Sequence, residues 1–367
     1  MSTSKPSLFQ VIADSLRREI RTQHAAGDRL PTEKELAARF EVSVFTVREA
    51  LAVLVYEGLL DRRRRRGTIV RDTLGKRQVA IVSELDLMQM PRPTFFWATF
   101  QQLHKAFAAE GVRTRNYIGS LPVSVMHDHE ETTCSDLYED IEAGRLLAVV
   151  VLIAPHSKAY WNKLRETSLP TIGHPESDHA VRPPQGELIR EAGRMLLEAG
   201  RTNVGLIGWN PNQVRNGNAM EASLREMGLN IPDRWVRIDQ SPLEPGAGWD
   251  DFLEIWTQGE NRPDGLIVSD DMLFEDVVRA MLALQVKVPE DLMIVTHSNK
   301  GLTPVVPFPH TRLEVDPADM AQTICQRTLQ ALRGEIQPRT EDRVAFRQFQ
   351  AGQDAAEQLL SALGEAP

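Results

Sequence analysis

The chain has 367 residues, of which 42% are hydrophobic, and a formal net charge of -9 at pH 7. This length allows two or three domains, and the apolar content is too high for a disordered chain. The longest strongly apolar run, at residues 146–154, is much shorter than the roughly 20 residues that a membrane span needs. Because the polar N-terminus also lacks the pattern of a signal peptide, we expect a cytoplasmic protein.

The charge is distributed unevenly along the chain. Residues 1–77 hold 16 Lys and Arg against 10 Asp and Glu, a balance of +6, whereas residues 78–367 hold 26 against 41, a balance of -15. Since local charge governs contact with nucleic acid, the basic N-terminal part can bind DNA although the whole chain is acidic.

The chain has two cysteines, Cys134 and Cys325. Two are too few for a disulfide framework or a thiolate zinc site, and we expect both to be free thiols.

The N-terminal part begins with two predicted helices. Residues 8–20 carry an apolar stripe at helical spacing, formed by Leu8, Val11, Ile12, Leu16 and Ile20. Thr32 and Glu35 form a capping box for a second helix, which ends near Phe40.

A third helix and a strand pair follow. Ser43 is the expected N-cap of a helix that ends at Gly58, and its inward stripe is Val47, Leu51 and Leu54. Two short helices with a tight link are typical of a helix-turn-helix. Short strands at 59–63 and 68–71 flank a turn of three arginines and Gly67, which predicts a wing.

From residue 78 the chain alternates apolar β-rich runs with amphipathic helices. Strands are expected at 78–83, 113–118, 147–153, 171–173, 203–207, 235–238, 265–269 and 292–296. Helices are expected at 96–110, 131–143, 158–166, 187–198, 220–227, 249–258 and 273–284. This alternation predicts an α/β body, a doubly wound parallel sheet covered by helices on both faces, which at this size divides into two lobes. Ligands of such folds bind beyond the carboxyl ends of the strands, here in a cleft between the lobes.

These observations give a domain plan. We expect a winged helix-turn-helix at 1–72, a linker at 73–77, a two-lobed domain for effector binding and dimerisation at 78–353, and a tail at 354–367.

Several motifs of the head resemble the winged helix of the gluconate-repressor-type (GntR) family. They are the run from Leu30 to Ala37, the run from Val47 to Leu51, the Glu57-Gly58-Leu59-Leu60 segment and Gly67-Thr68. The resemblance covers nearly all of residues 7–71. It implies that Lys34 contacts phosphate or base, that Thr46 and Arg48 face the major groove, and that Gly67 lets the wing approach the DNA backbone.

One position departs from that family. Val44, followed by Phe45, stands where family members commonly carry an arginine that reads guanine, and the alternative target for Val44 is a thymine methyl group. Without the resemblance, the position of Thr46 and Arg48 at the start of the recognition helix predicts base contacts, and Arg62 to Arg66 would neutralise phosphates. The full set of candidate DNA-contacting residues is Lys34, Ser43, Val44, Phe45, Thr46, Arg48, Arg64, Arg65, Arg66 and Gly67.

The body resembles the effector domain of the lactose and galactose repressor (LacI/GalR) family over roughly residues 77–353. The run from Arg262 to Asp271 and the run from Val286 to Val295 carry most of this resemblance. A winged-helix head on such a body looks like an arabinose-repressor type of hybrid regulator. The resemblance therefore implies a dimeric repressor of operator DNA that responds to a sugar-like effector.

That family holds its ligand with polar groups at strand ends and an aromatic ring. The matching and neighbouring positions here, our candidate effector-binding residues, are Phe95, Phe96, Arg215, Asn216, Trp249, Asp270, Asp271 and Ser298. Other positions depart from the pattern of that family. Asn216 stands where the family often has an arginine, and the segment after the last central strand reads Thr296-His297-Ser298. The aspartate that the family has after the fourth strand is replaced near Arg182. Carboxylates and aromatic rings suit a polyol, whereas Arg182 and Arg215 leave an anionic effector open.

Each candidate also has a simpler interpretation. Asp270 could only cap the next helix, Trp249 could be packing in a loop, and His297 is expected to be a satisfied histidine. The acidic segment from His127 to Glu131 is expected to be an exposed loop rather than a metal site, and no cofactor is expected. An enzyme lacks support because no nucleophile elbow, phosphate-binding loop or zinc-protease motif occurs. An exported solute-binding protein is opposed by the basic head.

Overall fold

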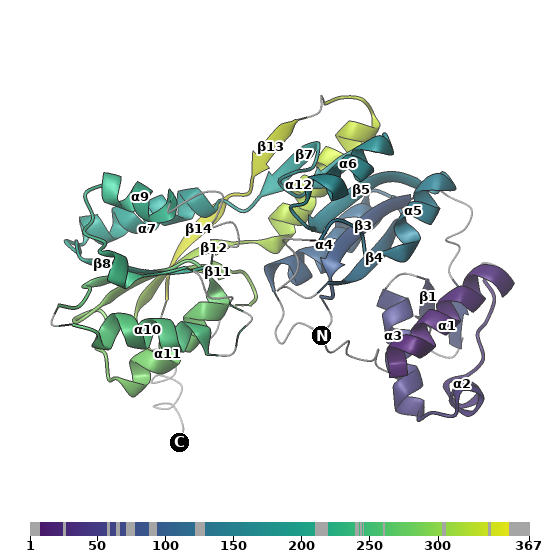
Figure 1. The fold of residues 1–367 in the computed structure, drawn as a ribbon, viewed down its shortest axis with the longest axis horizontal. Helices are drawn as coiled ribbons and strands as arrows, with labels where there is room; N and C mark the ends of the chain where they lie inside the picture. The colour runs from purple at the N-terminus through teal and green to yellow at the C-terminus, as the bar shows by residue number, and fades with distance from the viewer. Residues whose placement is uncertain are drawn as a thin grey trace, which may run out of the picture. The chain divides into compact units, whose positions relative to one another are not determined.

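The fold was analysed in a computed structural model (Figure 1). The structure describes residues 8–24, 27–56, 59–63, 67–70, 78–87, 94–121, 129–209, 219–238, 242, 244, 246–259, 261–302, 306–336 and 339–351. The expected linker at 73–77 and the tail at 354–367 lie outside these ranges, so the domain plan stays a prediction.

The N-terminal head contains the three expected helices and the wing. The helices are α1 (Leu8–Gln23), α2 (Glu33–Phe40) and α3 (Val44–Tyr56), and the wing strands are β1 (Leu60–Arg63) and β2 (Gly67–Val70). The two strands pair antiparallel, with Leu60 opposite Val70 and Arg63 opposite Gly67. The predicted helix-turn-helix followed by a hairpin is therefore confirmed.

Local chemistry explains where these helices begin. The capping box is formed, because Thr32 accepts a hydrogen bond from the Glu35 amide at 3.3 Å while the Glu35 carboxylate accepts one from the Thr32 amide at 2.6 Å. The buried stripe of α1 differs from the expected one. Ile12, Leu16 and Ile20 are buried in the head core, whereas Leu8 and Val11 are 58% and 47% exposed. The stripe that packs on the core thus begins one turn later than the sequence pattern indicates.

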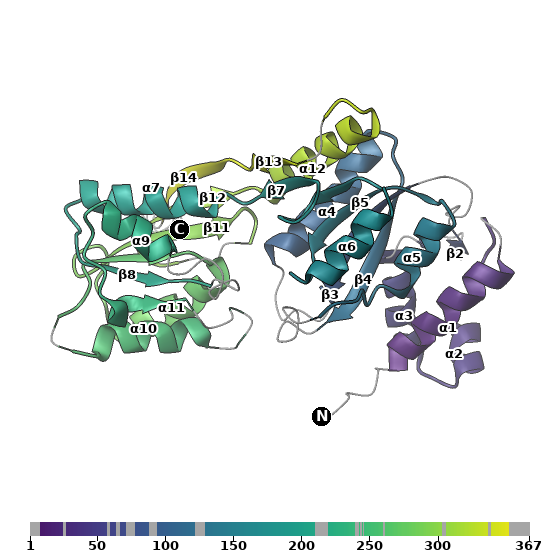
Figure 2. The ribbon, with the colours of Figure 1, turned by 45° about the horizontal axis from the view of Figure 1, so that its top comes forward.

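The first lobe is built on a six-stranded sheet in the order β13-β7-β6-β5-β3-β4. Its strands are β3 (Gln78–Leu85), β4 (Thr114–Leu121), β5 (Leu146–Ile153), β6 (Thr171–Gly173), β7 (His179–Arg182) and β13 (Thr340–Arg343). Its helices are α4 (Phe95–Ala109), α5 (Ser135–Glu142), α6 (Lys158–Glu166) and α12 (Pro317–Leu332). In Figure 2, α5 and α6 cover one face of this sheet, and α4 and α12 cover the other.

The second lobe repeats this plan with the order β14-β12-β11-β10-β8-β9. Its strands are β8 (Val204–Ile207), β9 (Val236–Arg237), β10 (Gly265–Val268), β11 (Met293–Asn299), β12 (His310–Val315) and β14 (Phe346–Ala351). Its helices are α7 (Gln185–Glu198), α9 (Ala219–Glu226), α10 (Ala247–Thr257) and α11 (Asp271–Ala283), with a 3-10 turn, η2 (Asp233–Trp235). Figure 1 shows α7 and α9 on one face and α10 and α11 on the other. The predicted two-lobed, doubly wound body is confirmed.

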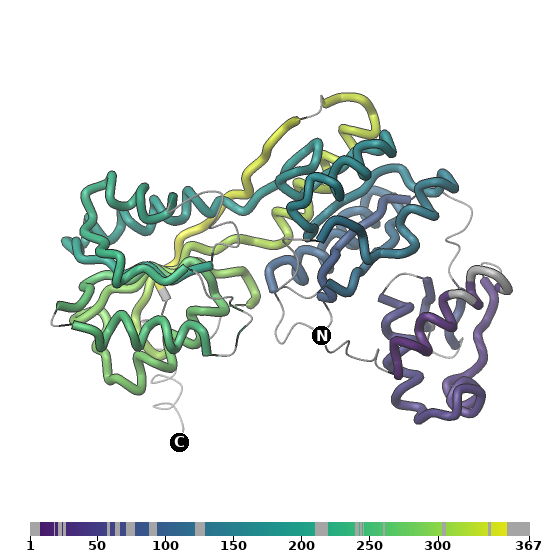
Figure 3. Tube along the Cα trace, viewed as in Figure 1, coloured from purple at the N-terminus to yellow at the C-terminus, as the bar shows by residue number. Residues whose placement is uncertain are grey.

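Several elements of the body were not predicted from the sequence. They are β7, β12, α12, β13 and β14, and β14 pairs antiparallel with β12 at the edge of an otherwise parallel sheet. The chain forms two compact units, Met1–Gln89 with Phe100–Val181 and Ala321–Asp342, and Met90–Thr99 with Arg182–Met320 and Arg343–Pro367. In the tube of Figure 3 the yellow C-terminal stretch accordingly contributes to both sheets.

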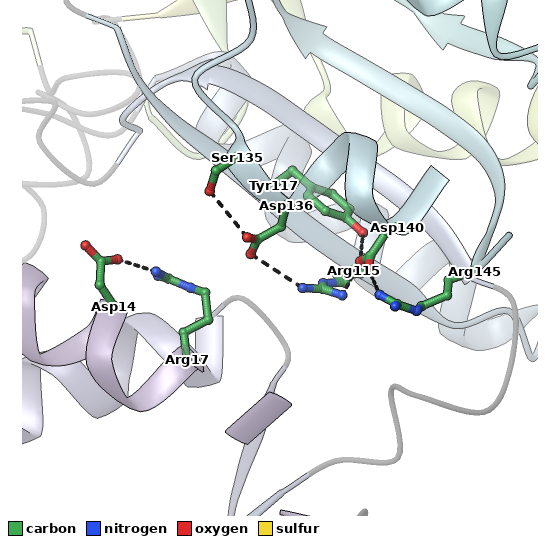
Figure 4. Close-up of polar contacts among 8 residues, drawn as sticks. All are labelled: Asp14, Arg17, Arg115, Tyr117, Ser135, Asp136, Asp140 and Arg145. Carbon is green, nitrogen blue, oxygen red and sulfur yellow. Dashed lines mark hydrogen bonds and ion pairs between the residues drawn. The ribbon is translucent and has the colours of Figure 1, made fainter. Parts of the chain in front are cut away.

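A buried cluster of charges joins β4, α5 and Arg145, the residue before β5, in the first lobe (Figure 4). The Asp140 carboxylate accepts hydrogen bonds from the Arg115 and Arg145 guanidinium groups and from the Tyr117 hydroxyl group. Arg115 and Asp140 are only 4% and 1% exposed, and Asp136 lies 3.6 Å from the Arg115 guanidinium. Because a buried charge is tolerated only when it is paired, this cluster constrains how α5 packs on the sheet.

Among the residues that the structure describes, no helix is long and apolar enough to cross a membrane.

Candidate DNA interface and strand-end site

The first turn of the recognition helix α3 is closed by Ser43. Its hydroxyl accepts a hydrogen bond from the Thr46 amide at 3.1 Å and lies 2.8 Å from the Thr46 hydroxyl. This confirms Ser43 as the N-cap. Val44 and Phe45 follow it and are 36% and 65% exposed, so the residues that depart from the family pattern face solvent at the start of the helix.

Glu33 connects the recognition helix to the wing. One oxygen of its carboxylate accepts from Arg48 through Nε at 3.3 Å and a terminal nitrogen at 3.0 Å, and the other oxygen pairs with Arg62 of β1. Glu33 was not among the predicted site residues. Its pairing brings two guanidinium groups from separate elements to one place, because a carboxylate can accept several hydrogen bonds at once.

The other predicted DNA-contacting residues are partly described. Lys34 is exposed on the first turn of α2. Gly67 opens β2 with a φ of +83°, a conformation that disfavours any residue with a Cβ, and a Cβ there would lie 2.6 Å from the Arg29 Nε. Arg64, Arg65 and Arg66 lie outside the described residues.

The described part of the head therefore presents a surface suited to a nucleic acid. The outward face of α3 carries Phe45 and Arg48, three residues apart on one side of the helix, while Val47 is fully buried beneath them. Arg62 on the wing adds positive charge beside Arg48. A helix of this exposure fits the major groove, and the guanidinium groups can contact base edges or phosphates.

A second candidate site lies at the carboxyl ends of β10 and β11 in the second lobe. These strands pair in parallel with Val268 opposite Thr296, which places Ser269 and Asp270 beside His297 and the residues after it. The sequence pattern placed Ser298 after the end of the strand. In the structure β11 extends to Asn299, so Ser298 lies within the strand. Asp270 is also the N-cap of α11, because it accepts from the Met272 and Leu273 amides at 2.9 and 3.3 Å.

Several polar atoms at this edge lack a hydrogen-bond partner among the described residues. They are the hydroxyl oxygens of Ser269 and Ser298 and the Nε2 atom of His297. The expectation that His297 is fully satisfied is therefore wrong for one ring nitrogen. A small, mostly apolar pocket of about 10 Å³, which has room for about one water molecule, lies between α7 and the sheet; Ser269, His297 and Gln185 line it, and Asp270 and Asp271 do not. Buried polar atoms without partners are rare in native proteins, which makes this edge a candidate ligand site.

The ionisable groups at this edge have shifted pKa values. Burial, followed by the neighbouring Asp271 carboxylate, raises the pKa of Asp270 to about 6. Burial likewise raises the pKa of Asp271 to about 6, although Asn299 opposes this by hydrogen bonding. Burial lowers the pKa of His297, and Asp270 opposes that shift. Two carboxylates side by side favour ligands that donate hydrogen bonds over anionic ligands.

The remaining predicted effector residues lie at the starts of α10 and α4 or outside the described residues. Trp249 lies in the first turn of α10 rather than in a loop, and packs against the apolar core of the second lobe. Phe95 and Phe96 begin α4, with their ring centroids 5.7 Å apart in an edge-to-face arrangement. Arg215 and Asn216 lie outside the described residues.

No group of three or more His, Cys, Asp or Glu side chains suited to a metal ion occurs in the described ranges.

The raised pKa of Asp270 predicts a pH-dependent effect of Asp270→Asn. Its folded-state pKa is above its ordinary value of 3.8, so the carboxylate lowers stability progressively as the pH rises from about 4 to above 6. Asparagine keeps the cap and removes the charge. Between pH 4.5 and pH 7.5, we expect the free energy of unfolding of Asp270→Asn to increase relative to wild type by roughly 1–3 kcal/mol. The melting temperature of the variant relative to wild type is expected to rise over the same pH range. A difference that stays constant with pH in thermal unfolding would contradict this assignment.

The head and the first lobe make contact through Tyr56, the last residue of α3. Its ring stacks on Phe100 of α4 with centroids 5.0 Å apart, and its backbone carbonyl accepts a hydrogen bond from the Asn116 side chain of β4. The recognition helix is thus packed at its C-terminal end against an element of the body.

Comparison with known proteins supports both halves of this description. Residues 8–70 match the sequence model of "Bacterial regulatory proteins, gntR family", and residues 193–353 match that of "Periplasmic binding protein-like domain". The chain is 46% identical over 68 residues to "Probable transcriptional regulator PhnF" of Escherichia coli (strain K12), which covers 18% of this chain and 28% of that protein. It is 28% identical over 109 residues to "HTH-type transcriptional repressor PurR" of Yersinia pestis (strain Pestoides F), which covers 29% of this chain and 32% of that protein.

Among solved structures, the chain is similar to one described as "transcriptional regulator CelR-cellobiose complex". That similarity has a TM-score of 0.60 at 15% identity, and covers 87% of this chain and 98% of the other. The chain thus matches less than a third of the length of the two curated relatives, while the structural likeness supports the fold of the body.

Together these matches define the architecture. Residues 8–70 resemble a gntR-type winged helix and residues 193–353 a periplasmic-binding-protein-like domain, and the body has the fold of the similar regulator structure, as the motifs predict. Both of these curated relatives are named as transcriptional regulators.

Proposed function

We propose that this protein is a transcriptional regulator that binds operator DNA through its winged helix and a small sugar-like effector at the strand ends of its body. The observation that carries the DNA-binding half is the exposed face of α3, where Arg48 is held beside Arg62 of the wing by a shared carboxylate. The DNA contacts are Lys34, Ser43, Val44, Phe45, Thr46, Arg48 and Gly67, joined by Arg64, Arg65 and Arg66. A protein that acts on operators works in the cytoplasm.

The chemistry of the strand-end site supports a polyol as the effector. The Asp270 and Asp271 carboxylates can accept hydrogen bonds from hydroxyl groups, and Ser269, Ser298 and His297 offer polar atoms without partners. The cellobiose complex with the similar fold is consistent with such a ligand. In this proposal Phe95, Phe96 and Trp249 pack on the ligand, and Arg215 and Asn216 contact its hydroxyl groups.

The regulatory cycle follows from two linked binding sites. The effector binds one arrangement of the lobes more tightly, and this shifts the equilibrium of the winged helices toward a state with lower operator affinity, which makes the protein a repressor. We propose a homodimer, because a second half-site raises the affinity that one small winged helix provides. Light scattering is expected to give twice the chain mass of 41.2 kDa at micromolar concentration.

The experiment is a selection of DNA by the full-length protein from a library of random duplexes. We expect wild type and Arg194→Ala to enrich a motif with two half-sites, and Arg48→Ala to enrich it weakly or not at all. Arg194 is a matched control because it is an exposed, ion-paired arginine on α7 of the body. A selection in which wild type enriches no sequence, at salt low enough for phosphate contacts, would refute the proposal.

The effector is sought separately by thermal shift with neutral sugars and sugar acids. A ligand that binds the native state raises the unfolding temperature. We expect neutral sugars to stabilise wild type and not Asp271→Ala. Stabilisation by sugar acids alone would contradict the polyol assignment.

A further inference from the structure

The start of the recognition helix carries an apolar surface that the rest of the head does not cover. Phe45 is 65% exposed and Val44 is 36% exposed, whereas the inward side of α3 is closed by the head core. An aromatic side chain left largely in water forgoes the stabilisation that burial of its apolar area would provide.

This surface lies on the DNA-reading side of the helix. Phe45 and Arg48 are three residues apart, which places them on the same face, and both are exposed. The wing residue Arg62 pairs with the same Glu33 carboxylate as Arg48, so the face of α3 that carries Phe45 also carries a cationic side chain that is tied to the wing. An exposed apolar side chain on the same helix face as an arginine suits a nucleic acid groove, where the arginine can meet phosphates or base edges.

The polar groups of the same turn are partly engaged with each other. The Ser43 and Thr46 hydroxyl oxygens lie 2.8 Å apart, and Ser43 also accepts from the Thr46 amide. These bonds hold the backbone at Phe45 in a fixed turn. The first turn therefore holds the backbone of Phe45 in place, so that DNA binding orders only the side chain there.

The major groove offers one apolar group to such a side chain. Guanine, adenine and cytosine present hydrogen-bond donors and acceptors there, whereas thymine also presents its C5 methyl group. A phenyl ring neither donates nor accepts conventional hydrogen bonds, so it gains from the methyl group and gains nothing specific from the other edges. The same methyl group occurs in 5-methylcytosine.

We infer that Phe45, flanked by Val44, reads the 5-methyl group of a pyrimidine in each operator half-site. This inference rests on the proposed DNA binding and names what the head recognises at the position where the family's arginine is absent. The operator is read there by an apolar contact, and guanine reading falls to Arg48.

The test uses a duplex enriched from the random library, in which each thymine is replaced in turn by deoxyuridine. For wild type, we expect one thymine in each half-site at which loss of the methyl group weakens binding about fourfold, the value for one buried methyl group. Phe45→Ala is expected to show less than a twofold effect at that position. Arg48→Ala serves as the matched control, since it weakens binding overall but retains the sensitivity to deoxyuridine.

Two further duplexes separate the sources of the methyl group. Cytosine at the sensitive position is expected to bind weakly, and 5-methylcytosine there is expected to recover affinity for wild type but not for Phe45→Ala. The inference is overturned if no thymine is more sensitive in wild type than in Phe45→Ala. That result differs from failure of the proposed function, in which no duplex is enriched at all. Phe45→Ala is expected to fold normally, because the ring lies outside the core.

Discussion

Arg48→Ala is expected to weaken binding to the selected operator by about 1–3 kcal/mol, which is roughly a 5- to 150-fold rise in the dissociation constant. The guanidinium of Arg48 is exposed on the outward face of α3, and its donors that are not bonded to Glu33 can contact a base edge or a phosphate. Glu33 already orders this side chain, so little rotamer freedom is lost on binding. The variant also relaxes specificity at one position of the operator.

Fluorescence anisotropy with a labelled operator measures this change. Arg194→Ala is the charge-matched control and is expected to bind as wild type does. Glu33→Gln keeps the shape of the side chain and weakens its hold on both guanidinium groups, so we expect a smaller loss than for Arg48→Ala. Equal affinity of wild type and Arg48→Ala would show that Arg48 does not contact the DNA.

Asp140→Ala is expected to destabilise the first lobe by about 3–5 kcal/mol, the cost of breaking a buried ion pair. The replacement leaves Arg115, which is only 4% exposed, without its main partner, and removes an acceptor of the Tyr117 hydroxyl group. Arg145 is more exposed and can turn to water, so Arg115 dominates the cost.

Urea and thermal unfolding provide the measurement. Asp136→Ala is the control, because Asp136 faces the same guanidinium at 3.6 Å from a more exposed position. We expect its effect to stay below 1 kcal/mol, roughly the value of a surface pair. If both variants lose the same stability, the Asp140 cluster does not anchor α5 on the sheet.

The head was predictable from sequence because its signals are local. The capping box at Thr32, the cap at Ser43 and the apolar stripe of α3 each lie within a few residues, and the structure has all three. The first turn of α1 was the exception. Leu8 and Val11 follow the helical period but lie beyond the core, which a periodicity pattern cannot show.

The body was predictable as a pattern but not in its connections. The strands β7, β13 and β14 are short or polar, so they carry no apolar run, and β14 pairs with β12 only through long-range contact. The sequence pattern proposed Asp270 as a strand-end site residue, which stays a prediction, and it did not propose Ser269 or His297. Their unpartnered atoms become visible only when β10 and β11 lie side by side.

Glu33 illustrates the same limit in the head. In the sequence it is one acidic residue at the start of a helix, where a carboxylate stabilises the helix by interacting with its dipole. Its second role, as the shared partner of Arg48 and Arg62, depends on the packing of α2 against α3 and the wing.

The central claim is that one chain binds operator DNA and couples that binding to a sugar-like ligand. The most direct measurement is the affinity of the full-length protein for its selected operator, by anisotropy, without and with a saturating sugar found by thermal shift. We predict specific binding that the sugar weakens at least fivefold in wild type, the lower range of an allosteric coupling of roughly 1–3 kcal/mol. Identical operator affinities with and without the bound sugar, or binding that does not depend on DNA sequence, would contradict the account.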